Sequence, residues 1–274
     1  MSLISDGVIY IIDSSKRIGG TNADFTFNIN IPRDQGFDRV CLLQAIIPKS
    51  YYLVNAPYNQ FILRENGVDT SITVPEGNYN VRTWISIVGG LLNTHSSQGW
   101  QYTITFPNEA TELQTGKFTI TVTNNIAQPS IIFPVNSVVY EQFGFVKEST
   151  NTFIDNSLVS SNVIKFQTED VLFLHSTLSK NNDQTAYTSV LQEIYASSTP
   201  PFTNIVYQNY GKVEAYSRKL ASDTSNVYSF QLTDENNRTI NLRGLNCVFT
   251  ILIYRKDNIN KLIAQSLLRN QYLQ

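Results

Sequence analysis

A two-residue period of hydrophobicity runs through most of this 274-residue chain and favours β-sheets. The stretch DFTFNINIP, residues 24–32, places its aromatic and aliphatic side chains on one face and Thr and Asn on the other. That pattern is typical of a half-buried strand. The stretches QYTITF (101–106) and KFTITVT (117–123) alternate in the same way and predict a hairpin. We therefore expect a mostly β protein.

The last β-like part of the chain departs from this alternation. Residues 227–242 predict a strand, a turn at TDENN and a second strand, and residues 248–254 are then apolar on both faces. A strand with one face in water alternates apolar and polar residues. Something must therefore cover the second face of 248–254. Two coverings are open: a neighbouring subunit, or the C-terminal helix or inserted block of the same chain.

Helical periodicity is confined to a few segments. The stretch 78–93 repeats apolar residues at helical spacing, with Asn78 or Asn80 as a possible cap. Shorter helices are expected at 137–143 and around Val190, Leu191 and Ile194, and a strand is expected at 212–219. The C-terminal stretch 257–270 predicts an amphipathic helix.

The order of these elements predicts the domain organisation. Strands come first, a block of mixed helices and strands follows, and strands return. We expect an all-β fold, a jelly-roll β-sandwich with an α+β insertion. The jelly roll would comprise 1–70 and 150–256, the insertion 71–149, and the C-terminal helix or tail 257–274.

Charge and hydropathy limit the partners. The formal net charge is −2, charged residues make up 15% of the chain, and no run of Lys and Arg occurs. We therefore expect no direct binding of nucleic acid, which requires many cations facing phosphates. No signal peptide is recognisable and no apolar stretch is long enough for a membrane helix, so we expect no membrane insertion. A weakly charged surface suits packing against other protein.

Residues for chemistry are sparse. The two histidines, His95 and His175, lack partners at metal-binding spacings, and the chain contains no HExxH, CxxC or GxSxG motif. The acidic pair Glu169-Asp170 would point to opposite faces of a strand. We expect no catalytic residue, no metal site and no cofactor. A hydrolase whose carboxylates come from separate strands leaves no local signature and stays open.

The chain has two cysteines, and two interpretations are open. Cys41 lies in an apolar run and Cys247 opens the last strand. Either both are buried free thiols, or they form one disulfide between neighbouring strands.

Five stretches carry a family resemblance. They are IIDSSKRIGGTNADFTFNINIP (11–32), VCLLQAIIPKSYYLVNAPYNQFIL (40–63), ITVPEGNYNVRTWISIVGGLLN (72–93), VVYEQFGF (138–145) and YSFQLTDENNRTINLRGLNCVFTILIYR (228–255). In this order they resemble penton (vertex) capsid proteins of virophages, polinton-like viruses and related large double-stranded DNA viruses. The resemblance covers most of the chain as separate patches.

The resemblance implies a role and partners. It implies a homopentamer at the vertex of an icosahedral virus particle, contact with the major capsid protein and with other minor capsid proteins, and no enzymatic activity. It places the protein in the virion capsid, after synthesis and assembly in the host cell cytoplasm. Two alternatives remain: a minor capsid or spike protein without five-fold symmetry, and a jelly-roll glycan-binding, lectin-like attachment protein.

Eight residues are candidates for contacts between subunits. Four belong to the apolar final strand and four to the apolar face of the tail helix, which is marginal in isolation and needs a surface to dock on. They are Phe249, Ile251, Ile253, Tyr254, Ile259, Leu262, Ile263 and Leu267.

Overall fold

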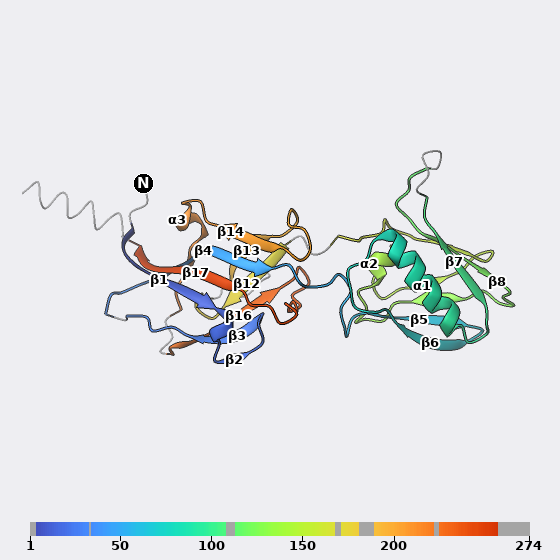
Figure 1. Cartoon of the computed structure of the whole chain (residues 1–274), viewed down its shortest axis with the longest axis horizontal. Coiled ribbons are helices and arrows are strands. Elements are labelled where there is room, and N and C mark those ends of the chain that lie inside the picture. Colours follow the sequence, from blue (N-terminus) through green and yellow to red (C-terminus); the bar gives the residue numbers. More distant parts are fainter. Residues whose placement is uncertain are drawn as a thin grey trace, which may run out of the picture. The chain divides into compact units, whose positions relative to one another are not determined.

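The computed structural model describes residues 4–32, 34–107, 113–167, 171–180, 189–221 and 225–256. The chain forms two compact units, coloured by sequence in Figure 1. The first comprises the residues up to Tyr51 and those from 169 on, and the second runs from Tyr52 to 168. The second unit is wider than the insertion expected at 71–149, because the strand at 60–65 pairs with the strand at 130–132.

The first unit consists almost entirely of strands. They are β1 (Ile4–Asp13), β2 (Gly19–Gly20), β3 (Asp24–Asn28), β4 (Arg39–Pro48), β12 (Val171–Ser176), β13 (Val190–Tyr195), β14 (Asn204–Gln208), β15 (Arg218–Lys219), β16 (Val227–Thr233) and β17 (Val248–Lys256). Two short helices, η1 (Ser14–Lys16) and α3 (Val213–Tyr216), lie between strands.

These strands form two antiparallel sheets. One has the order β1-β17-β4-β14, with β15 beside β4, and its four strands lie side by side in Figure 1. The other has the order β13-β12-β16-β3-β2. Of the eight longer strands in chain order, the first sheet holds the first, eighth, third and sixth, and the second holds the fifth, fourth, seventh and second. This interleaved order is that of a jelly roll, so the expected fold class is confirmed.

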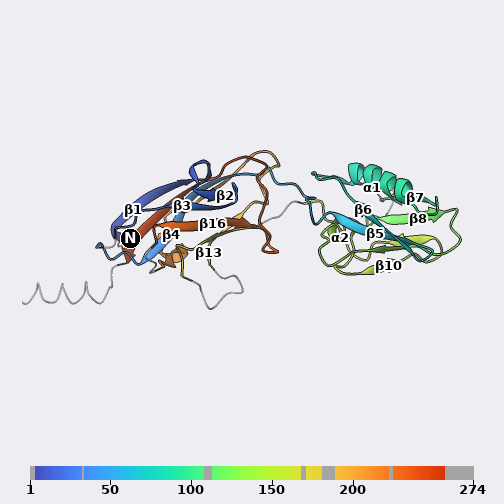
Figure 2. The same ribbon diagram turned by 90° about the horizontal axis from the view of Figure 1, so that it is seen from below.

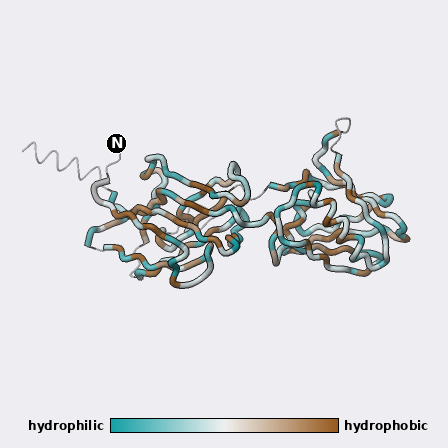
Figure 3. The backbone as a smooth tube through the Cα atoms, in the orientation of Figure 1, coloured by the Kyte–Doolittle hydropathy of each residue, from teal (hydrophilic) through white to brown (hydrophobic). Residues whose placement is uncertain are grey.

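The core of the first unit lies between the two sheets. Its inward positions come from alternate residues of each strand, and they include three stacked rings. Phe25 lies 5.6 Å from Phe230 and 6.5 Å from Phe249 between ring centroids. Figure 3 shows the apolar segments running along these strands.

The second unit has its own core. Its strands are β5 (Gln60–Glu65), β6 (Val68–Thr73), β7 (Gln101–Thr105), β8 (Thr119–Thr123), β9 (Ser130–Ile132), β10 (Thr150–Thr152) and β11 (Ser157–Val159), and its helices are α1 (Val81–His95) and α2 (Tyr140–Phe143). The sheets have the orders β10-β9-β5-β6 and β11-β8-β7. Figure 2 shows α1 along one side of this unit. The helix buries Trp84, Val88 and Leu92, which are four residues apart and share one face.

Several elements follow the sequence patterns, and three do not. The second strand expected after the TDENN turn, at 239–242, is reduced to an isolated bridge between Thr233 and Thr239. The expected hairpin at 101–123 is present as β7 and β8. The segment 212–219, expected as a strand, contains α3.

The expected short helix around Val190 is strand β13. The register between β12 and β13 shifts so that Leu191 is an extra residue, and Leu191 and Ile194 are both buried. This bulge changes the spacing of buried residues from two to three, which made a strand resemble a helix.

Candidate interaction surface

The final strand, β17, buries its inward face completely. Phe249, Ile251 and Ile253 have no exposed surface and lie in the core between the sheets. β17 is flanked on both sides, by β1 and β4, so its backbone is paired as well. A strand that is paired on both edges and covered on both faces carries apolar residues at successive positions, as this one does.

The outward face of β17 is covered at one end by the chain itself. Leu252 and Tyr254 are buried with Cys41 in a small cluster, and Leu43 and Val213 pack against it. Val213 is the first residue of α3, so the cover is the segment between β14 and β15. Neither of the coverings expected from the sequence accounts for this end of the strand.

This burial corrects part of the expected subunit contact. Phe249, Ile251, Ile253 and Tyr254 are enclosed by their own chain and offer no surface to a neighbour. The other candidates, Ile259, Leu262, Ile263 and Leu267, lie outside the described residues.

The other end of the same outward face is open. Ile9, Ile11, Ile46 and Val206 are exposed there, and Val248 is half-buried. These residues are not among the contact candidates expected from the sequence. The sequence does contain a signal for this apolar face. The stretches GVIYIID and QAII are apolar at both odd and even positions, as 248–254 is.

The entry segment is held by local polar contacts. The Asp13 carboxylate accepts a hydrogen bond from the Ser15 N–H at 2.8 Å, and the Arg17 guanidinium donates to the Ser14 carbonyl at 2.9 Å. At Gly20, φ is +91° and a Cβ would lie 2.2 Å from the Asp24 carbonyl oxygen. Only glycine fits there, so Gly20 allows the chain to turn from β2 into β3.

The stretch PEGNYN positions α1. The Asn80 side chain accepts from the Thr83 N–H while the Thr83 hydroxyl lies 3.0 Å from the Asn80 N–H, which is a reciprocal N-terminal cap. The Asn78 side chain accepts from the Leu53 N–H at 2.8 Å. The Tyr79 hydroxyl donates to the Pro75 carbonyl, and its ring meets Trp84 edge-on at 5.3 Å.

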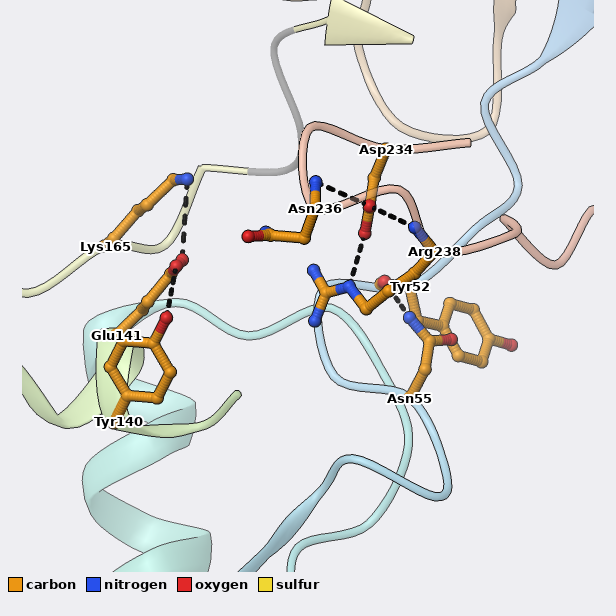
Figure 4. Close-up of polar contacts among 8 residues, drawn as sticks. All are labelled: Tyr52, Asn55, Tyr140, Glu141, Lys165, Asp234, Asn236 and Arg238. Carbon is orange, nitrogen blue, oxygen red and sulfur yellow. Dashed lines mark hydrogen bonds and ion pairs between the residues drawn. The ribbon is translucent and has the colours of Figure 1, made fainter. Parts of the chain in front are cut away.

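The stretch VVYEQFGF forms α2 and its end. Gly144 has φ of +72°, and a Cβ there would lie 2.5 Å from the Asn162 carbonyl oxygen. Beside it, the Lys165 ammonium lies 3.4 Å from the Glu141 carboxylate, which Figure 4 shows.

The turn after β16 is organised by one carboxylate. Asp234 accepts from the Asn236 and Arg238 backbone N–H groups, both at 2.9 Å, and its other oxygen lies 2.6 Å from the Arg238 Nε (Figure 4). Asp234 is buried, so these bonds stabilise the conformation of the turn TDENN.

A buried carboxylate in the second unit joins three elements. Glu65 accepts hydrogen bonds from the Ser96 hydroxyl at 2.7 Å, the Ser97 hydroxyl at 3.0 Å, the Gln98 N–H at 3.1 Å and the Tyr102 hydroxyl at 2.7 Å. Burial raises the pKa of Glu65, but these bonds outweigh it, so the pKa is lowered overall. The pKa of Tyr102 is raised, chiefly by burial and further by this carboxylate. All four donors belong to the same chain, so the cluster stabilises the fold of the second unit.

The two cysteines and the two histidines are buried or hydrogen-bonded within the chain. Cys41 and Cys247 are both free and buried, and burial raises the pKa of each thiol to about 11. The disulfide interpretation is therefore wrong. The His95 ring donates from Nδ1 to the Leu91 carbonyl, and His175 Nε2 lies 2.9 Å from the Thr233 hydroxyl.

The described residues contain neither a cluster suited to a metal ion nor a helix suited to a membrane. Within the part of the chain that the structure describes, no group of three or more His, Cys, Asp or Glu side chains is arranged to hold a metal ion. Among the same residues, no helix has the length and apolar character needed to cross a membrane.

Comparisons with known proteins find similar chains among solved structures. No family model and no curated protein matches the chain. Among solved structures, it is similar to the selenomethionine-labelled mavirus penton protein, with 12% sequence identity and a TM-score of 0.43. The match covers 90% of this chain and 98% of that chain.

Proposed function

We propose that the chain is a structural subunit of a virus particle and forms the pentameric vertex, or penton, of an icosahedral shell. Its partners in that role are four further copies of itself, the major capsid protein and other minor capsid proteins. Its location is the virion capsid, reached after assembly in the host cytoplasm. No enzymatic step is assigned to it.

One observation carries this proposal: the residues that make the sequence resemble penton proteins serve the architecture. Gly20 and Gly144 allow close backbone approaches, Asn80 caps α1, and Asp234 fastens a turn. Each acts on its own chain, and none points polar groups at a shared ligand position. Residues that set strand turns and helix ends are those that a shape-based, structural role requires.

The jelly-roll order supports the same role. A jelly roll alone does not specify function, since lectins and cupins share it with capsid proteins. The weak charge of this chain, with 15% charged residues, favours extensive contact with other protein. The second compact unit is inserted between residues 51 and 169 of the first, so the chain offers two separately folded units for contacts in a shell.

The proposal is tested by native mass measurement and by particle composition. The purified chain is measured over a wide concentration range, and purified particles from infected cells are imaged with an antibody against it. A five-subunit species, with label restricted to the vertices, is the expected result. Label elsewhere on the particle would instead identify a minor capsid or spike protein without five-fold symmetry. Absence from particles would overturn the proposal.

A second candidate function follows from exposed rings in the first unit. Tyr195, Phe202 and Tyr210 are all largely exposed, and aromatic side chains commonly stack on sugars in lectin sites. This observation favours a glycan-binding attachment protein. Saturable binding on a glycan array that is lost in Tyr210→Ala would support this function. The absence of binding to any glycan on the array would leave the structural role as the sole candidate.

A further inference from the structure

The open end of the outward sheet face has an aliphatic centre. Val248 pairs with Ile46, and Ile46 pairs with Val206, so these three stand in one row across β17, β4 and β14. Ile11 pairs with Thr250, one outward position along, and Ile9, the next outward residue of β1, lies at the sheet edge beside the buried Leu252. Side chains alternate along a strand, so all five point away from the sandwich core.

The exposed fractions of its aliphatic side chains distinguish this face from an ordinary solvent-facing sheet. Ile9 is 59% exposed, Ile11 67%, Ile46 46% and Val206 62%. A sheet face in water normally carries polar side chains at such positions.

The outer face of β3 and β16 in the same unit follows that rule. Its paired outward residues are Asn28 with Val227, Thr26 with Ser229 and Asp24 with Gln231. Five of these six are polar, so the β-sheet preference of aliphatic residues does not by itself account for the apolar face.

The apolar face is also almost free of charge. In the rows of Val248 and Ile11, its remaining outward positions are Asp13, Thr250, Gln44 and Gln208. Asp13 is the ionisable one among these, and it lies at the edge with its carboxylate bonded to Ser15. Such a face exerts no field that would attract a basic or acidic partner, and it does not repel a copy of itself.

The size of the face matches the centre of a protein interface. Four strands about 4.8 Å apart and two open rows of outward side chains about 6.7 Å apart give a footprint of about 260 Å². A stable interface takes about 800 Å² from each partner, with an apolar centre and a polar rim. The aliphatic row with Gln44, Gln208 and Thr250 around it has that composition, so the partner must be a folded surface that also covers the rim.

We propose that this face packs against a neighbouring copy of the same chain. The inference rests on the proposed function for the identity of the neighbour, because a vertex places identical copies side by side. Identical copies are also the commonest partners in soluble oligomers. Packing of a flat apolar sheet face onto a second folded surface removes the four exposed side chains from water.

The test uses single substitutions that the free chain tolerates. Ile11→Glu and Val206→Glu place a carboxylate at positions that are already more than half exposed, so each subunit should fold normally. Val227→Glu is the matched control, since Val227 is 45% exposed on a strand of the other sheet. The native mass of each variant is measured across the concentration range in which the natural chain associates.

The expected result is a rise of at least about tenfold in the concentration needed for association in Ile11→Glu and Val206→Glu, with Val227→Glu unchanged. A second measurement uses Ile11→Cys, because both natural cysteines are buried. Its thiol should be protected from a maleimide in the associated state and react on dilution.

Two results would overturn the inference. The first is association that is unaffected by both glutamates, and the second is a natural chain that stays monomeric at every concentration. Either would leave the shell role intact, because that role is tested separately by the presence of the chain in particles.

Discussion

Replacement of Glu65 by Gln should destabilise the second unit strongly. The carboxylate is 1% exposed and accepts four hydrogen bonds, at 2.7 to 3.1 Å. Gln is nearly isosteric, but it replaces one acceptor oxygen by a donor NH₂ and removes the charge. The hydroxyl groups can rotate to accept, whereas the Gln98 N–H cannot. Hydrogen bonds to a charged group contribute about 1.5–3 kcal/mol and neutral ones about 1 kcal/mol, so we expect a loss of about 2–4 kcal/mol.

The effect should depend on pH in a defined direction. The pKa of Glu65 in the folded chain lies below its ordinary value of 4.5. The stabilisation from the carboxylate is therefore complete above pH 4.5 and is lost as the pH falls through the folded-state pKa. The natural chain and Glu65→Gln should differ most at neutral pH, and the difference should narrow at pH values below 4.5.

The chain provides a selective assay for this prediction. It has two tryptophans, Trp84 and Trp100, and both are buried in the core of the second unit. Urea unfolding followed by tryptophan fluorescence therefore reports this unit. Glu148→Gln is the control, because that side chain is 53% exposed and should change stability by no more than about 0.5 kcal/mol. An unchanged midpoint in Glu65→Gln, or a difference that persists undiminished at low pH, would refute the reasoning.

Three further predictions concern the two cores and the backbone. Phe249→Ala removes a fully buried ring from the first unit and should cost about 3–5 kcal/mol, seen as an earlier thermal transition by circular dichroism, with the tryptophan transition unchanged. Gly144→Ala should destabilise the second unit by more than about 1 kcal/mol, because φ is +72° at that residue. Gly90→Ala within α1 should instead stabilise the unit by about 0.5–1 kcal/mol. Equal changes in the urea unfolding midpoint for the two variants would contradict this. Cys41 and Cys247 should resist a thiol reagent at pH 8 in the folded chain and react fully in urea, so rapid labelling of the folded chain would count against their burial.

Local periodicity allowed the fold class to be predicted. The alternation in 24–32 and 101–123 corresponds to β3 and to the β7–β8 hairpin, and the 78–93 pattern corresponds to α1 with Asn80 as its cap. These elements are readable because the burial of each residue follows its position in the strand or helix.

Other features depended on pairing between distant segments. Leu191 and Ile194 seemed helical because a bulge opposite β12 changes the spacing of buried residues. The boundary of the second unit lies before β5 because β5 pairs with β9, about seventy residues later. No local pattern contains such information.

The residues of 248–254 already predict cover on both faces, since burial of apolar side chains is favourable. What provides this cover depends on how distant segments pack. The inward face meets the opposite sheet, and the outward face at Leu252 and Tyr254 meets Val213 of α3, which packs beside Cys41. The same structure left Ile9, Ile11, Ile46 and Val206 open. Composition cannot distinguish these two groups, because whether an aliphatic side chain is enclosed depends on which distant segment the topology brings over it.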